Sequence, residues 1–208
     1  MNIVKYEHAC FTVEKDEQIL VVDPGKFSTD FIAPENVVAV VITHEHGDHF
    51  DQEQLASIID KNPDAVIFGH DAITSKIEVF ATHAVKTGDV VQAGPFTLEF
   101  HGNQHAVIHS SIPVIPNLGV LINELLYYPG DSFTLTHKPI DTLAIPVAAP
   151  WMKIGEAMDF LQLIKPRFAF PTHDKILSSE GQELVDRILG NVAQENSITY
   201  QRISTLEI

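Results

Sequence analysis

Short apolar runs separated by polar turns fill the first half of the chain. Runs in which apolar and polar residues alternate predict strands, and Val37–Ile42 is apolar enough for a strand buried on both faces. Asp51 predicts the start of a helix that runs to about Lys61, and a second, short helix is expected from Asp71. The predicted strands are Asn2–Glu7, Ala9–Glu14, Gln18–Val22, Val37–Ile42, Ala65–Gly69 and Phe96–Phe100, the last as part of a hairpin.

The second half repeats this order loosely. Apolar positions at helical spacing predict helices over Ile154–Ile164 and Ser179–Val192. Strands are expected at Gly119–Ile122, Leu125–Tyr128, Thr142–Ile145 and Arg167–Phe170, with one or two closing strands in Ile198–Leu206. Each half of the chain thus shows strands followed by helices. This order predicts an α/β (α+β) fold in which two mixed β-sheets pack face to face with helices outside. Because no linker divides the halves, at about 1–100 and 101–208, we expect one domain over residues 1–208.

The composition narrows the classes of partner. The 208 residues carry 28 acidic and 13 basic side chains, a formal net charge of −15, and this balance disfavours binding to nucleic acid or to anionic membranes. The single Cys10 excludes an internal disulfide framework and thiolate-rich zinc sites. No apolar run approaches transmembrane length and the first residues do not form a signal peptide. We therefore expect a cytoplasmic protein whose partner is a small molecule.

Four metal-binding side chains lie close together directly after the apolar run Val37–Ile42. They are His44, His46, Asp48 and His49. Residues two positions apart in an extended backbone point the same way, so His44 and His46 share one side. The freedom of Gly47 lets the loop turn back, which brings the other two to the same place. Imidazole and carboxylate ligands suit zinc and its neighbours among the transition metals, so the segment predicts a metal site.

Three later segments offer the remaining ligands of a two-metal site. Each follows a predicted strand and opens into a loop, the usual place for a functional group. Their candidate ligands are His105, Asp131 and His173. His109 lies four residues after His105, so the two could share one face of a helix and either could reach the metal. If His109 is not the ligand, it lines the pocket or bonds to the backbone.

The pattern His-X-His-X-Asp-His after a buried strand, with the later segments in order, resembles the metallo-β-lactamase superfamily over essentially the whole chain. The resemblance implies a four-layer αββα sandwich with two divalent metal ions. One metal would be held by His44, His46 and His105, the other by Asp48, His49 and His173, with Asp131 bridging them. The aspartate equivalent to Asp23 supports the metal-binding loop in relatives without being a ligand.

Within the superfamily, the chain is most similar to a lactonase-like branch that includes ascorbate-6-phosphate lactonases. His8, in Tyr6-Glu7-His8-Ala9-Cys10-Phe11, resembles the Gly-His-Ala-Ser-Phe element of that branch, whose histidine lies near the metals. Glu7 and Cys10 depart from that element. The protruding basic arm with which ribonuclease Z-like relatives hold RNA has no counterpart in this sequence.

Two residues near the predicted ligands each have two interpretations. Trp151, the only tryptophan, lies in a stiff loop with Pro146 and Pro150 after a predicted strand. It is either a hydrophobic plug over the end of the sheet or a pocket wall that selects flat or apolar parts of a substrate. Lys175, two residues after His173, is either an exposed, solvated lysine or a cation that steadies a substrate carboxylate or phosphate.

The ligand set predicts a metal-dependent hydrolase. Two metals about 3.5–4 Å apart lower the pKa of a shared water, and the resulting hydroxide attacks a carbonyl carbon or a phosphorus. Asp48 or Asp131 would orient this nucleophile or carry its proton, and the substrate would be an ester, a lactone or a phosphoester. Zinc is the default metal, with manganese, iron or nickel as alternatives. A mononuclear iron oxygenase on the same fold, a non-catalytic metal- or ligand-binding protein, and a homo-oligomeric state are left open.

Overall fold

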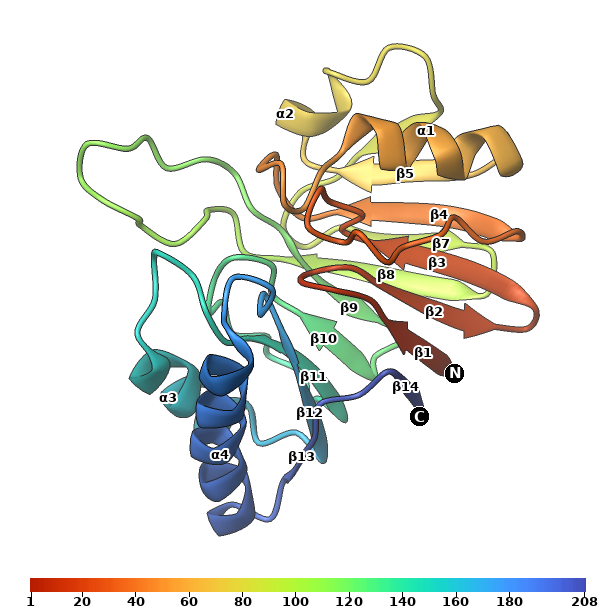
Figure 1. Ribbon diagram of the computed structural model, residues 1–208. Helices are drawn as coiled ribbons and strands as arrows, with labels where there is room; N and C mark the ends of the chain where they lie inside the picture. Colours follow the sequence, from red (N-terminus) through yellow and green to blue (C-terminus); the bar gives the residue numbers. More distant parts are fainter.

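Two seven-stranded β-sheets pack face to face in the computed structural model, which describes residues 1–208 (Figure 1). Helices cover the outer face of each sheet, so the molecule has four layers in the order helix, sheet, sheet, helix. The apolar side chains between the sheets form the largest core, which includes Phe11, Phe100 and Phe170. The predicted fold class, an αββα sandwich of two mixed sheets, is confirmed.

The first sheet contains both ends of the chain. Neighbouring strands are antiparallel from β14 to β3 and parallel from β3 to β6. In spatial order they are β14 (Thr205–Glu207), β1 (Asn2–Lys5), β2 (Phe11–Lys15), β3 (Gln18–Val22), β4 (Val37–Ile42), β5 (Val66–Gly69) and β6 (Thr82–Ala84).

The second sheet is built on the same plan. Neighbouring strands are parallel from β13 to β10 and antiparallel from β10 to β7. In spatial order they are β13 (Thr199–Tyr200), β12 (Phe168–Thr172), β11 (Thr142–Pro146), β10 (Leu126–Tyr128), β9 (Gly119–Ile122), β8 (Phe96–His101) and β7 (Val90–Ala93).

Two helices cover each sheet. Helices α1 (Gln52–Lys61) and α2 (Asp71–Thr74) pack on the first sheet through a core that includes Leu55 and Ile58. Asp51 caps α1, because its carboxylate accepts hydrogen bonds from the N–H groups of the first turn. Helices α3 (Ile154–Ile164) and α4 (Ser179–Glu195) pack on the second sheet through a core that includes Phe160 and Leu189.

The predicted and observed elements differ at edges and in loops. The sequence does not predict β6, because all three of its residues are exposed and no buried apolar position marks the strand. Strand β1 ends at Lys5 rather than Glu7, since the chain turns at His8, whose φ is 59°. The segment from His105 to His109 contains no helix, so the shared helical face that the spacing allowed does not form.

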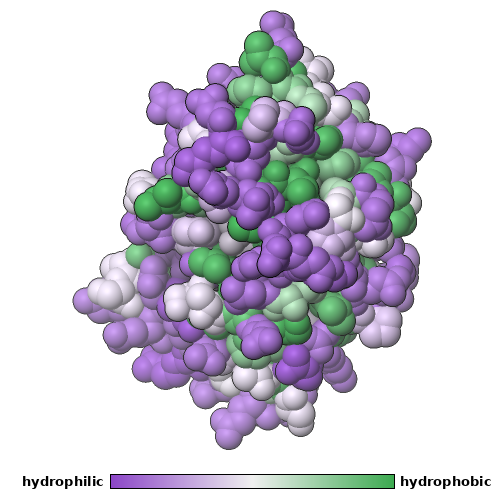
Figure 2. All heavy atoms as spheres, turned by 90° about the vertical axis from the view of Figure 1, so that its right-hand side faces the viewer, coloured by the Kyte–Doolittle hydropathy of each residue, from purple (hydrophilic) through white to green (hydrophobic).

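The chain passes from the first sheet to the second between β6 and β7, and β14 returns to the first. One domain with halves at about 1–100 and 101–208 stays a prediction. No helix of the structure is long and apolar enough to span a membrane. Hydrophilic side chains predominate on the face shown in Figure 2, with apolar side chains scattered among them, in keeping with the net charge of −15.

Candidate metal centre

The loops that follow β4, β8, β10 and β12 bring the seven predicted ligand residues together. Their ligand atoms form two groups, and within each group all atoms lie within 4.8 Å of one another. One group contains His44, His46, His105 and Asp131, and the other contains Asp48, His49 and His173 together with His8. Residues more than a hundred positions apart in the sequence thus converge on one place.

The loop that carries the first motif is tightly folded. The N–H groups of His49 and Phe50 both donate to the carbonyl oxygen of His46, at 3.0 and 2.9 Å. Gly25 lies directly against this turn, and a Cβ atom at this position would come 1.9 Å from the carbonyl oxygen of Asp48. Because backbone atoms cannot move aside as the end of a flexible side chain can, the loop requires glycine at position 25.

The carboxylate of Asp131 lies between the two groups. Its Oδ1 is 3.1 Å from Nε2 of His49, and its Oδ2 is 3.1 Å from Nε2 of His173 and 3.3 Å from Nε2 of His105. Burial by itself would raise the pKa of Asp131, but His49 and His173 outweigh burial and hold this pKa well below its ordinary value. Asp131 is therefore ionised at neutral pH, and its charge faces ligands of both groups.

Three imidazole rings are each held through Nδ1. Nδ1 of His49 lies 2.7 Å from Oδ2 of Asp23, and those of His105 and His173 lie 2.5 Å from backbone carbonyl oxygens. Because these oxygens only accept hydrogen bonds, each Nδ1 carries a proton and donates it. Nε2 of each ring is therefore directed to the centre, which is how proteins orient histidine ligands of metals.

Four buried atoms at the centre have no hydrogen-bond partner. They are Nε2 of His49, His105 and His173, and Oδ1 of Asp131. These atoms approach their neighbours closely, but not at angles that make hydrogen bonds. Since buried polar atoms without partners are costly, the arrangement fits an ion that binds them. Imidazole and carboxylate donors without a thiolate fit a divalent metal such as zinc.

Asp23, at the end of β3, connects β4 to the metal-binding loop. Its Oδ1 accepts the backbone N–H of Thr43 at 2.8 Å, and its Oδ2 accepts the hydroxyl of Thr43 at 2.7 Å as well as the ring Nδ1–H of His49. Burial would lower the pKa of His49, but Asp131 and Asp23 outweigh burial and raise this pKa well above its ordinary value. Asp23 thus holds the strand end and the His49 ring in one arrangement.

His8 lies in the second group, beside Asp48. Its Nε2 is 3.1 Å from Oδ2 of Asp48, and its ring centroid is 4.1 Å from that of His173. Burial lowers the pKa of His8 to about 4, so the ring is neutral at neutral pH. Burial would raise the pKa of Asp48, but the His173 ring beside it and the hydrogen bond from His8 outweigh burial and lower it. As a carboxylate only accepts, His8 donates from Nε2.

Trp151 contacts the centre through a hydrogen bond that the sequence does not predict. Its Nε1 donates to Oδ2 of Asp131 at 2.7 Å, and its buried ring packs edge-on against Phe133. Neither predicted interpretation, a plug or a wall for the substrate, includes this contact. No motif marks it, because only the fold brings the two loops together.

Two predicted site residues lie outside the cluster. His109 is exposed, and its Nδ1 is hydrogen-bonded to the hydroxyl and N–H groups of Ser111. The structure therefore places His105, and not His109, among the other candidate ligands. Lys175 is exposed and forms an ion pair with Glu7 rather than reaching the cluster.

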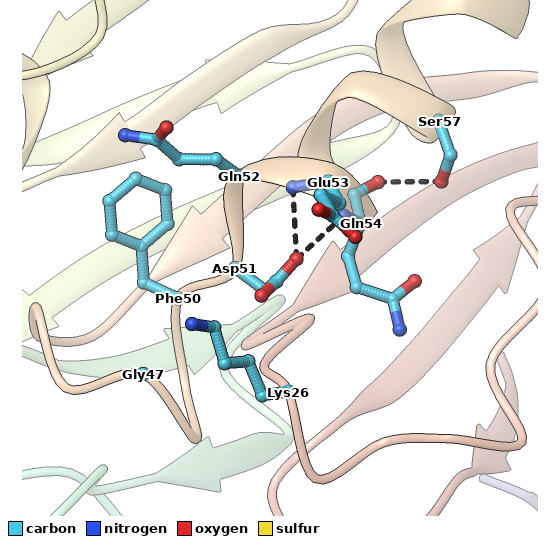
Figure 3. Close-up of a pocket in the computed structure, with 8 residues that line it drawn as sticks. All are labelled: Lys26, Gly47, Phe50, Asp51, Gln52, Glu53, Gln54 and Ser57. Carbon is cyan, nitrogen blue, oxygen red and sulfur yellow. Dashed lines mark hydrogen bonds between the residues drawn. The ribbon is translucent and has the colours of Figure 1, made fainter.

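The centre is open to solvent on one side. His46 is half-buried and 22% of the Asp48 side chain is exposed, whereas the other candidate ligands are buried. A hollow of about 840 Å³ lies beside the same loop, lined by Lys26, Gly47, Phe50 and the first turn of α1 (Figure 3). None of the seven candidate ligands lines this hollow. Among the candidate ligands, solvent therefore reaches mainly His46 and Asp48.

Two packed mixed sheets with a histidine–aspartate cluster in the loops at their ends define the class of metallo-β-lactamase-like proteins. The family model described as beta-lactamase superfamily domain matches residues 2–173, a range that contains all seven candidate ligands. The chain belongs to the beta-lactamase superfamily.

Curated relatives and solved structures agree with this membership. Protein Rv0786c of Mycobacterium tuberculosis is 34% identical over 187 residues, which cover 88% of each chain. A UPF0173 metal-dependent hydrolase of Carboxydothermus hydrogenoformans is 26% identical over 193 residues, covering 83% of this chain and 84% of the relative. The fold is shared with Igni18, a metallo hydrolase from Ignicoccus hospitalis, at a TM-score of 0.75 and 18% identity, covering 100% of this chain and 98% of that chain. The lactonase-like branch stays a prediction.

Proposed function

We propose that this protein is a metal-dependent hydrolase with a dinuclear centre, which cleaves an ester, lactone or phosphoester bond in a small molecule. The observation that carries the proposal is the set of buried, unpartnered atoms of His49, His105, His173 and Asp131 that face one another. Membership in the superfamily and the relative named as a metal-dependent hydrolase support this class of reaction.

The ligands divide into two sets that share one carboxylate. One ion is assigned to His44, His46 and His105, and the other to Asp48, His49 and His173, with Asp131 between them. Zinc is the first candidate metal, and manganese, iron and nickel accept the same donors. When bound, such ions lower the pKa of a water molecule and polarise the carbonyl or phosphoryl oxygen of a substrate.

The two carboxylates have different roles in this proposal. Asp48 is ionised and partly exposed, so it is placed to accept a hydrogen bond that orients the attacking water on the side open to solvent. Asp131 is buried between the two groups and orients the ligands around it. The proposal assigns Ser132 no role as a nucleophile, since its buried hydroxyl is hydrogen-bonded within its own loop, to the carbonyl oxygen of Pro129 at 3.1 Å.

Metal analysis followed by a substrate screen tests the proposal. We expect about two equivalents of metal per chain after reconstitution, and turnover of an aryl ester, a lactone or a phosphodiester that chelation abolishes. A metal-to-protein ratio near zero would contradict the dinuclear centre. Metal uptake without turnover of the ester, the lactone or the phosphodiester would favour a non-catalytic metal- or ligand-binding protein. Turnover that stops without oxygen would favour the iron oxygenase, so the screen is run aerobically and anaerobically.

The variants His105→Ala and His109→Ala form a matched pair for the ligand assignment. His105 lies in the cluster and His109 is exposed, four residues further along the same loop. We expect His105→Ala to lose about one equivalent of metal and His109→Ala to keep the content of the unmodified protein. Equal loss in both variants, or loss only in His109→Ala, would contradict the assignment.

A further inference from the structure

The indole N–H of Trp151 is a donor to Asp131 that comes from outside the proposed ligand set. The 2.7 Å contact between Nε1 and Oδ2 is buried, since only 9% of Trp151 is exposed. An indole nitrogen only donates, so the direction of this hydrogen bond does not depend on a tautomer. We propose that Trp151 is a positioning residue that holds the Asp131 carboxylate in the orientation in which it faces both ligand groups.

The backbone of Asp131 is fixed, but its carboxylate is not fixed by the backbone. The N–H of Asp131 donates to Oδ1 of Asn117 at 3.0 Å, and its carbonyl oxygen accepts the N–H of Ala106 at 2.8 Å. Both contacts leave the carboxylate free to rotate about its last bond. The N–H of Trp151 occupies one acceptor position of Oδ2 and thereby defines the plane of the carboxylate, with Oδ1 left for His49.

The loop after β11, which carries Trp151, is itself fixed close to the second group. The N–H of Val147 donates to the carbonyl oxygen of Thr172 at 3.1 Å, and the carbonyl oxygen of Ala148 accepts Nδ1–H of His173 at 2.5 Å. This loop contributes no ligand, yet it orients His173 through Ala148 and Asp131 through Trp151. The inference rests on the proposed metal centre and adds a residue that shapes it.

A phenylalanine at position 151 separates this role from simple packing. Trp151→Phe keeps an aromatic ring against Phe133 while it removes the N–H donor and part of the indole volume, so the Phe133 control is needed to separate the donor from packing. Hydrogen bonds to a charged acceptor are stronger than neutral ones, and loss of a group that orients a ligand commonly weakens metal binding about 10–100-fold. Phe133→Leu is the matched control, because it disturbs the same aromatic contact and leaves the donor in place.

The first experiment measures zinc affinity by competition with a chromophoric chelator, together with the visible absorption of the cobalt-loaded proteins. We expect Trp151→Phe to bind zinc at least about 10-fold more weakly, with an altered cobalt spectrum, and Phe133→Leu to stay within about threefold of the unmodified protein. Equal affinity and spectrum in Trp151→Phe would overturn the inference. If the unmodified protein itself binds no metal, the proposed function fails instead.

A second experiment uses the unmodified fold. The chain has one tryptophan, so the indole N–H of a ¹⁵N-labelled sample gives a single resonance. In the metal-free protein we expect this proton to exchange slowly with solvent, and we expect its resonance to shift on addition of zinc and in Asp131→Asn. A rapidly exchanging proton, or a resonance that neither change moves, would overturn the inference even if Trp151→Phe does not fold.

Discussion

Nδ1 of His49 lies 2.7 Å from Oδ2 of Asp23, and both side chains are completely buried. His49 is at the end of the metal-binding motif, whereas Asp23 follows a different strand of the first sheet. The contact fixes which nitrogen of His49 carries the proton and directs the other nitrogen to the centre. The position of a proposed ligand thus depends on a residue that binds no metal.

Asp23→Asn tests this dependence. The amide keeps the shape of the side chain but offers one acceptor oxygen in place of two, so the backbone N–H of Thr43 on Oδ1 and the Nδ1–H of His49 on Oδ2 cannot both keep an acceptor. We expect metal affinity to fall at least about 10-fold, measured by chelator competition. Asp16→Asn makes the same chemical change in an exposed turn and should leave affinity unchanged. Similar affinities in both variants would refute the supporting role of Asp23.

Metal binding should release protons at neutral pH. Burial lowers the pKa of His173, but Asp131 outweighs burial and raises it to about 9, and the pKa of His49 is raised as well. Both rings are therefore protonated at pH 7 in the metal-free protein and must lose a proton to bind a metal. Calorimetric titration with zinc in buffers of different ionisation enthalpy measures the number released. Apparent affinity should rise with pH up to about 9, and binding without proton release would contradict these directions.

His8 should act on the second metal group through Asp48. Removing its N–H in His8→Phe leaves Asp48 without the imidazole hydrogen bond that it accepts from His8, whereas His8→Gln keeps an N–H donor. We expect His8→Phe to lower metal content and His8→Gln to restore part of it, by elemental analysis. Normal metal content in His8→Phe would show that the donor is not needed.

His8 should also make the folded protein less stable at acid pH. The pKa of His8 is about 4 in the folded protein, below its ordinary value of 6.5, so the unfolded chain binds more protons between these values. The buried, neutral ring of His8 therefore contributes fully to the free energy of unfolding above pH 6.5. This contribution is lost as the pH falls through about 4, because the ring must then be protonated. In metal-free His8→Gln, urea titrations should show a smaller loss across this range. A loss equal to that of the unmodified protein would assign the effect to other groups.

Gly25→Ala should damage the fold and the centre together. The new Cβ would meet the backbone of Asp48 and His49 at 1.9–2.4 Å, so the metal-binding loop must move. We expect a loss of stability of about 1–3 kcal/mol or more, as in overpacked cores, and reduced metal content. Gly190→Ala is the control, since nothing lies within 4 Å in that helix, and it should stabilise the protein by about 0.5–1 kcal/mol. Thermal melts measure the change in stability and elemental analysis measures the metal content. If Gly25→Ala changes neither quantity, the close contact at position 25 is contradicted.

The sequence predicts the fold class and most elements, because burial imposes a period on the residues of each strand and helix. Val37–Ile42 and Ile154–Ile164 are found at their predicted bounds for this reason. The pattern fails at β6, which buries none of its residues. It also fails after His105, where a spacing of four residues is compatible with a helix, but the chain is irregular from His105 to His109.

The sequence by itself determined the kinds of donor and their local spacing, because His44, His46, Asp48 and His49 are neighbours along one short loop. Only the tertiary structure decided which distant groups join them. His105 lies in the cluster while His109 is exposed, His8 donates to Asp48, and Trp151 donates to Asp131. These contacts join loops from both sheets, and their geometry is set by how the two apolar faces pack rather than by any local pattern of residues.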